Sequence, residues 1–356
     1  MSSSHLWNGI VFGGAILGFI IGAGFASGQE ILTFYTHLGF WGSFAAGLFA
    51  MLVMSVVYAV VMEDGRRLQF KDTNDIFEYY CGKYLGEVLK WVVAIVMFLV
   101  ASIMFAGAGA TLEQQYGLDP MVGRLLMAAL TIVTVILGLK NLVNVIGVIA
   151  PLIAIFAIAV GFVGILSNPA GLTGSDELIA TLDLNTPYPN WWSTGFMYAA
   201  YLTMGLVPFV CGVGAQAKTR GEAVGGGIFG GVGYMLGVMI LGFGMMAHIQ
   251  EVHHLEIPAL GLLGTSSPVI ANAFAVALML AIYTTAVPML WTAVNKLAPV
   301  DGTPKYRIIT IVLGVIGLFG GLFKFSTLIG IVYPALGWVG LVIIVCIVIR
   351  KLRGAK

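Results

Sequence analysis

A glycine-rich stretch from Gly18 to Glu30 interrupts the first long apolar segment of the chain, where its residue types are suited to binding a small charged ligand. Glycine weakens a helix, and an opened helix leaves backbone N–H and C=O groups without partners. At membrane depth such groups persist only inside protein or beside a wet cavity, so a broken helix is a candidate binding site. The alternative is that the pairs Gly18-xxx-Gly22 and Gly24-xxx-Gly28 only let two helices cross closely.

The backbone of this stretch predicts one end of a site for a zwitterion. A substrate carboxylate would accept hydrogen bonds from free N–H groups of Gly22, Ala23 and Gly24, at the positive end of the half-helix that follows. Because glycine has no side chain, an anion can approach its backbone closely. Phe25 and Gln29, on the same stretch, would form part of the pocket wall.

Glu30 is the one acidic residue that falls inside a predicted span. An ionisable group at membrane depth indicates function by default. Glu30 is a candidate for gating an outer vestibule, for coupling protons or for holding a cationic substrate. The alternative is a solvated position one turn below the outer surface, because the span ends near Tyr35. The sequence leaves these roles open.

The composition requires a membrane environment. Of 356 residues, 9% are charged and 59% hydrophobic, and the mean hydropathy is +1.00. A chain this apolar would expose far too much oily surface in water, which indicates an all-α polytopic membrane protein. The three cysteines are dispersed and suggest neither a disulfide framework nor a metal site. Without a phosphate-binding loop, a nucleophile elbow or a dinucleotide fingerprint, nothing predicts ATP use, an organic cofactor or an enzyme, and nothing indicates nucleic acid.

Ten apolar segments are expected to span the membrane within a single transmembrane domain, 1–356. They are 8–35, 42–62, 88–112, 121–139, 143–166, 191–217, 224–248, 268–297, 306–323 and 326–349. Nearly all Lys and Arg residues lie at one end of these spans, with Arg124 and Lys324 at the other. We expect the protein to lie in the cell membrane. The positive-inside rule then places both termini, including the tail 350–356, on the cytoplasmic side. The connection 250–267 is expected to form a lid on the outer side.

Two halves of five spans each would be inverted relative to one another, because the number of spans in each half is odd. Repeat one would cover about 8–166 and repeat two about 191–349, joined by an external linker, 167–190. Span six then corresponds to span one and should also be broken, and it contains Pro208 between Gly205 and Gly212. Carbonyl groups freed there would face the substrate's ammonium group.

The residues expected around that second break extend the predicted site. They are Thr203, Gly205 and Leu206, with Tyr201 as an aromatic wall beside the ammonium group. Phe and Tyr in a membrane bundle more often serve packing, which is the alternative for Tyr201.

The motif Ile21-Gly-Ala-Gly-Phe25 resembles the first-helix motif of the amino acid–polyamine–organocation superfamily. The longer stretch from Gly22 to Glu30, together with the ten-span layout, resembles the YkvI-type membrane proteins over essentially the whole chain. This resemblance implies a LeuT-like inverted-repeat fold, in which spans one, two, six and seven move against spans three, four, eight and nine. It leaves the substrate open.

The resemblance also implies a sodium site. Sodium-coupled members of the superfamily hold an ion between carbonyl groups of the first helix and an Ala-x-x-(Ser/Thr)-(Ser/Thr) motif on span eight. This chain has Ala281, Thr284 and Thr285 in that pattern, and the aligned carbonyl groups are those of Gly18 and Ile21. Neutral oxygens suit a hard cation. The alternative is that both threonines bond back to their own helix.

We therefore expect a secondary active transporter that couples sodium to the uptake of a small amino acid or related zwitterion by alternating access. Proton-coupled relatives use a lysine in span five, and 143–166 has none, which favours sodium. The alternatives are a proton-coupled or exchange transporter of an amine or nucleobase, with Glu30 carrying the proton, and a membrane sensor or assembly protein. A membrane enzyme with a metal at His253 and His254 is the least favoured. Apart from substrate and lipid, no partner is predicted, and the oligomeric state stays open.

Overall fold

The computed structural model describes residues 3–138, 142–182, 184, 186–264 and 268–354, and all regular elements in these ranges are helices. In chain order they are α1 (Ser3–Ile20), α2 (Ala23–Ser27), α3 (Gln29–Phe34), the 3-10 helix η1 (Thr36–Leu38), α4 (Gly39–Leu68), α5 (Asp75–Cys81), α6 (Lys83–Tyr116), α7 (Pro120–Leu137), α8 (Leu142–Ser167), α9 (Pro169–Thr173), α10 (Ser175–Ile179), α11 (Trp191–Ala215), α12 (Arg220–Ala247), α13 (Ile249–Val252), α14 (Pro258–Gly264), α15 (Pro268–Leu297), α16 (Pro304–Gly320) and α17 (Phe325–Leu352).

Seven stretches of the described chain are long and apolar enough to cross a membrane. They are Gln29–Leu68, Lys83–Tyr116, Pro120–Leu137, Trp191–Ala215, Arg220–Ala247, Pro268–Leu297 and Phe325–Leu352. The chain is therefore a multi-pass helical membrane protein. The described apolar parts of α1 and α8, Trp7–Ile20 and Pro151–Ser167, are shorter, so the count of ten spans stays a prediction.

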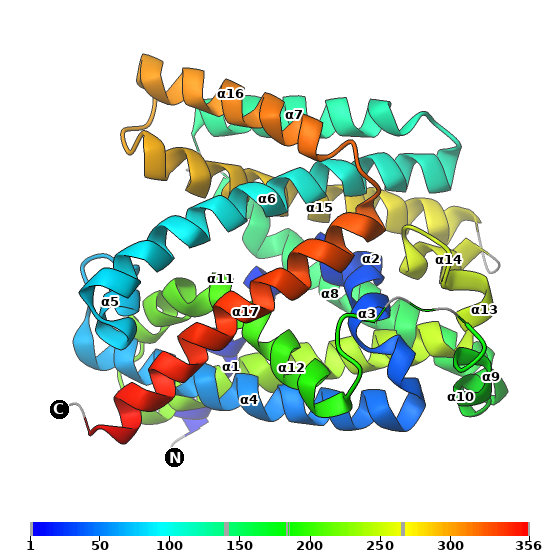
Figure 1. The fold of residues 1–356 in the computed structure, drawn as a ribbon, viewed down its shortest axis with the longest axis horizontal. Coiled ribbons are helices and arrows are strands. Elements are labelled where there is room, and N and C mark those ends of the chain that lie inside the picture. The colour runs from blue at the N-terminus through cyan, green and yellow to red at the C-terminus, as the bar shows by residue number, and fades with distance from the viewer. Residues whose placement is uncertain (1–2, 139–141, 183, 185, 265–267, 355–356) are drawn as a thin grey trace.

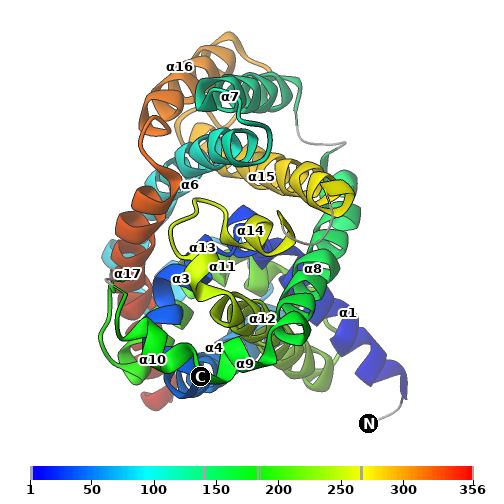
Figure 2. The ribbon, with the colours of Figure 1, turned by 90° about the vertical axis from the view of Figure 1, so that its right-hand side faces the viewer.

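The long helices form two groups with a flanking helix on either side. In Figure 1, α6, α7, α15 and α16 lie along one side of the molecule, and α1, α4, α11 and α12 along the other. Within the groups, α6 contacts α7 and α15, while α4 contacts α11 and α12. Figure 2 shows α8 and α17 on opposite flanks. The short helices α2 and α3 connect the two groups, since α2 contacts α15 and α3 contacts α12.

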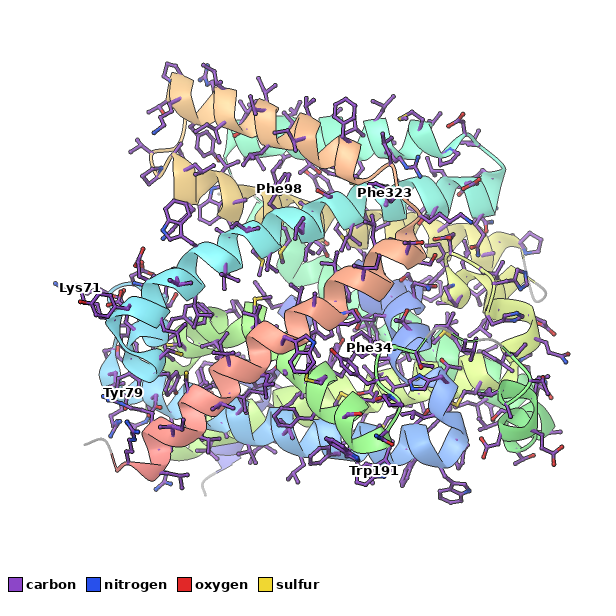
Figure 3. The ribbon with its side chains drawn as sticks, viewed as in Figure 1. Phe34, Lys71, Tyr79, Phe98, Trp191 and Phe323 are labelled. Carbon is purple, nitrogen blue, oxygen red and sulfur yellow. The ribbon has the colours of Figure 1, made fainter. Side chains whose placement is uncertain are left out.

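The two ends of the molecule differ in their connections. Both termini lie at the same end as α5, while α9, α10, α13 and α14 lie at the opposite end (Figure 1). Lys71 and Tyr79 mark the first of these ends in Figure 3, and Trp191, exposed by 46%, begins α11 at the periphery. The predicted lid region contains α14, which contacts α2 and α3 and so covers the broken first span from one side.

The break predicted in the first span is present. Helix α1 ends at Ile20, and Gly22 has an extended backbone with φ −112° and ψ −167°. Helix α2 then runs for five residues before Gly28, whose φ of +79° separates it from α3. That left-handed conformation favours glycine, because a Cβ would crowd the backbone.

The break predicted in span six is absent, which corrects the sequence interpretation. Helix α11 is continuous from Trp191 to Ala215, with Pro208 inside it. A proline deprives only one carbonyl, here that of Met204, of its usual donor, and neighbouring helices can hold such a helix together. The row of freed carbonyl groups expected from Thr203 to Leu206 is therefore not formed.

Candidate functional site

A cavity of about 100 Å³ lies where the broken first span meets both helix groups. Its lining includes Gly22, Ala23, Gly24, Phe25 and Glu30 of the broken span, Met97, Val100 and Met104 of α6, Tyr201, Met204 and Gly205 of α11, Thr285 and Met289 of α15, and Tyr333 and Leu336 of α17. One water needs about 10–15 Å³ on this measure, so the cavity has room for a small solute. Apart from the backbone, Glu30, Thr285 and the two tyrosines, these lining side chains are apolar.

The break supplies unpaired backbone groups of both kinds. Within the described chain, the N–H groups of Ala23, Gly24 and Phe25 at the start of α2 have no acceptor. The carbonyl groups of Gly18 and Ile21 have no backbone donor there either. Gly22 differs from its prediction, because its N–H donates to the Ile20 carbonyl at 2.8 Å and is not free for an anion.

Glu30 is buried and accepts hydrogen bonds from three tyrosines. Its exposed fraction is 3%, so the solvated position that the sequence allowed is excluded. Tyr198 and Tyr234 donate to Oε1 at 2.7 and 2.8 Å, and Tyr201 donates to Oε2 at 2.9 Å. No Lys, Arg or His side chain contacts Glu30 within the ranges that the structure describes. In this part of the chain the carboxyl group thus has neutral donors and no cationic partner.

The tyrosines are held in place by one another and by Phe34. Tyr198 and Tyr201 are three residues apart and share one face of α11. Tyr201 stacks on Tyr333 with ring centroids 5.0 Å apart, and on Phe34, labelled in Figure 3, at 5.6 Å. Tyr234 and Tyr333 were not among the predicted site residues. Each is a tyrosine inside an apolar span, and this feature could have indicated them, because a buried tyrosine hydroxyl usually has a hydrogen-bond partner.

Two glycines of the motif face different partners across the break. A Cβ on Gly24 would collide with Glu30 Oε2 and lie 3.1 Å from the Tyr333 hydroxyl. A Cβ on Gly22 would lie 2.9 Å from Thr285 Oγ1 on α15. Gly24 therefore allows the carboxyl group to rest against α2, and Gly22 allows α15 to approach the break. Gly28 allows close packing instead, since a Cβ there would lie 2.6 Å from Met245 Sδ.

The threonines of the predicted sodium site bond back to their own helix. The hydroxyl groups of Thr284 and Thr285 donate to the Ala281 carbonyl at 3.1 and 2.8 Å. This bonding is the alternative that the sequence left open, and it occupies the Ala281 carbonyl. A hydroxyl that donates its proton still has lone pairs for a cation, so the side chains of Thr284 and Thr285 remain candidate ligands.

Two predicted substrate contacts do not line the cavity. Gln29 lines a separate hollow of about 280 Å³ with Thr33, His253 and Ser326. Thr203 is fully buried, and its hydroxyl donates to the Ala199 carbonyl at 2.7 Å on its own helix. Neither residue therefore takes its predicted role in this conformation.

The described residues hold no cluster of three or more His, Cys, Asp or Glu side chains suited to a metal ion. The His253 ring nitrogen lies 3.0 Å from the carbonyl of Ile249 on the neighbouring turn, and His253 packs edge-on against His254. The metal-dependent enzyme considered from the sequence therefore finds no support at these histidines.

Sequence comparisons find two similar proteins of Bacillus subtilis (strain 168). No protein-family model matches it. It is 26% identical over 334 residues to the uncharacterized protein YyaD of Bacillus subtilis (strain 168), covering 94% of each chain. It is 29% identical over 123 residues to the uncharacterized membrane protein YkvI of the same strain, covering 33% of this chain and 34% of YkvI.

Comparison with solved structures identifies the fold. MhsT in complex with L-phenylalanine has a TM-score of 0.63 at 18% identity, covering 95% of this chain and 87% of MhsT. Inward-facing Mhp1 has a TM-score of 0.61 at 14% identity, covering 94% and 73%. A Na⁺-coupled sialic acid symporter has a TM-score of 0.60 at 12% identity, covering 93% and 78%. The chain has the LeuT-like fold of these proteins, as the resemblance implied.

Proposed function

We propose that this YkvI-related chain of LeuT-like fold is a secondary active transporter that couples sodium to the uptake of a small amino acid or related zwitterion. The proposal rests on the break between α1 and α2. This break lines a cavity and places Gly22 beside Thr285 of the opposite helix group. Broken helices with free backbone groups at such a junction are typical of transporter binding sites. The sialic acid symporter of similar fold is Na⁺-coupled, which supports the choice of ion.

The helix contacts support a 5+5 inverted repeat. Exchanging the two halves would exchange α1 with α11, α4 with α12, α6 with α15 and α7 with α16. The contact of α1 with α12 then corresponds to that of α11 with α4, and the contact of α6 with α7 to that of α15 with α16. The pair α7 and α15 likewise corresponds to α16 and α6. A repeat of this kind lets one helix group rock against the other around a fixed site.

The membrane orientation follows from charge. The connections at the end that holds α5 and both termini carry most of the Lys and Arg residues. By the positive-inside rule this end faces the cytoplasm when the protein lies in the cell membrane.

The sodium ion would join the two helix groups. The unpaired carbonyl groups of Gly18 and Ile21 belong to the broken span, and the hydroxyl groups of Thr284 and Thr285 belong to α15. An ion that contacts both the carbonyl oxygens of the broken span and the hydroxyl oxygens of α15 binds more tightly to the conformation that brings these oxygens together. By linkage it shifts the population toward that conformation and raises the affinity for a substrate that prefers it.

Sodium is expected to stabilise the detergent-purified protein against heat, relative to potassium at equal ionic strength. An ion present at about 100 times its Kd adds about 2.7 kcal/mol to the free energy of unfolding. Changing Thr284→Ala together with Thr285→Ala should remove this sodium effect and sodium-driven uptake into proteoliposomes. The matched control is Thr292→Ala, whose hydroxyl also bonds back to its own helix, at 2.8 Å to the Pro288 carbonyl. A full sodium effect in the double variant would refute the ion assignment.

A second candidate is proton-coupled transport, which the burial of Glu30 at the cavity wall favours. A carboxyl group that exchanges a proton between the two sides would carry the coupling without sodium. Uptake would then follow an imposed pH gradient in sodium-free buffer and would be lost in Glu30→Gln.

A further inference from the structure

The carboxyl group of Glu30 has one hydrogen-bonding position left. An ionised carboxylate accepts about four hydrogen bonds, two on each oxygen. Tyr198 and Tyr234 occupy Oε1, whereas Oε2 has a single donor, Tyr201. The open position is therefore on Oε2, the oxygen that rests against Gly24 at the cavity wall.

The charge of Glu30 also has no partner among the described residues. The three tyrosine hydroxyl groups are neutral, and no basic side chain of the described ranges reaches the carboxylate. A buried carboxylate is costly unless a cation pairs with it. A ligand that brings a cationic donor to Oε2 would satisfy both the charge and the missing hydrogen bond.

Among the described residues that line the cavity, Glu30 is the one charged acceptor for such a cation. Helix α11 is continuous, so it frees at most the neutral carbonyl of Met204. The Tyr333 hydroxyl, which has no hydrogen-bond partner in the described chain, lies beside Gly24 and is a further neutral acceptor. The wall opposite these groups is apolar, with Met97, Val100 and Leu336.

We propose that Glu30 binds the ammonium group of the substrate through Oε2, so that the transported solutes are small amines with an apolar body, amino acids among them. This inference rests on the proposed transport function and names its substrate class. The ammonium group is the required feature for binding. A carboxylate, which would use the N–H groups of Ala23 and Gly24, adds affinity but is not required.

The test compares ligands of one shape on the wild-type protein. Isopentylamine, isopentanol and 4-methylpentanoate share a branched apolar body and differ in the polar group. Isothermal titration of the detergent-purified full chain is expected to show binding of the amine and none of the alcohol or the carboxylate. Equal binding of the alcohol, or no binding of the amine at millimolar concentration, overturns the proposal without any mutation.

The variant Glu30→Gln keeps the shape of the side chain, removes its charge and replaces one acceptor oxygen with an amide NH₂ donor. Its affinity for isopentylamine should fall about 10- to 100-fold, the range for a hydrogen bond to a charged group. Glu177→Gln, the same chemical change at an exposed position of α10, should bind as the wild type does. Sodium-dependent stabilisation of Glu30→Gln shows that the variant is folded.

The remaining outcomes separate the two proposals. Unchanged amine binding in Glu30→Gln, with loss of uptake driven by a pH gradient, assigns Glu30 to proton transfer and overturns the ammonium assignment. Amine binding that depends on Glu30, but without uptake into proteoliposomes under any ion gradient, supports the ammonium site and refutes the transport function.

Discussion

The variant Gly24→Val is expected to lose binding of isopentylamine while it keeps stabilisation by sodium. A Cβ at position 24 would occupy the space of Glu30 Oε2 and approach the Tyr333 hydroxyl to 3.1 Å. The carboxylate must then leave α2, and the two branch methyl groups of valine fill the space beside it. The sodium ligands are spared, because Gly22, and not Gly24, faces Thr285. Overpacking of this kind costs about 1–3 kcal/mol of stability, less than most folded proteins have in reserve.

The matched control for this variant is Gly14→Val on α1. Gly14 is exposed, and a Cβ there would meet no atom within 4 Å. Both variants place the same side chain in the same predicted span, and only one touches the carboxylate. Isothermal titration should therefore show normal amine binding in Gly14→Val. Wild-type binding in Gly24→Val would refute a role of Gly24 at the substrate site and indicate that this glycine serves helix packing.

The interruption of the first span could be predicted from the sequence, because its signals are local. Gly22 adopts an extended backbone and Gly28 a positive φ, both of which glycine permits at low cost. Span six carries the equally local signal of Pro208, yet α11 continues through it. One missing N–H does not decide between a bent helix and a broken one. The packing of neighbouring helices decides, and that packing is not encoded in the segment itself.

The surroundings of Glu30 could not be predicted, because they come from distant parts of the chain. Its donors Tyr198, Tyr201 and Tyr234 are 168, 171 and 204 residues away. Gln29 shows a second difficulty. Neighbouring residues of a helix point about 100° apart, since a turn has about 3.6 residues, and the helical phase restarts at Gly28. The sequence interpretation placed Gln29 in the pocket wall and left the place of Glu30 open, whereas in the structure Glu30 lines the cavity and Gln29 a different hollow.

The largest effect on stability is expected at the end of the molecule that holds α5, where Asp64 is buried. Asp64 is 1% exposed near the end of α4, and Tyr80 of α5 donates to its Oδ2 at 2.6 Å. Lys351 of α17 donates to its Oδ1 at 2.6 Å, and Arg67 lies 3.5 Å from the same oxygen. The carboxylate thus joins three helices, and its two cationic partners are about 40% exposed.

Changing Lys351→Ala together with Arg67→Ala should lower the free energy of unfolding by about 3–5 kcal/mol, because it leaves a buried charge without a cation. Either change alone should cost less, since one cation remains. The free energy of unfolding is measured by denaturant or thermal unfolding in detergent. The control is Lys305→Ala plus Arg307→Ala, because both residues are exposed. Loss of such surface charges typically changes stability by less than about 0.5 kcal/mol.

Adding Asp64→Asn to the Lys351→Ala and Arg67→Ala variant separates the charge from the contacts. Asparagine removes the unpaired charge and can still accept the hydrogen bond from Tyr80. If the buried charge causes the loss, the triple variant must be more stable than the double variant, although it has one more change. Equal or lower stability of the triple variant would show instead that the long side chains of Lys351 and Arg67 stabilise this end by packing along α4 and α17.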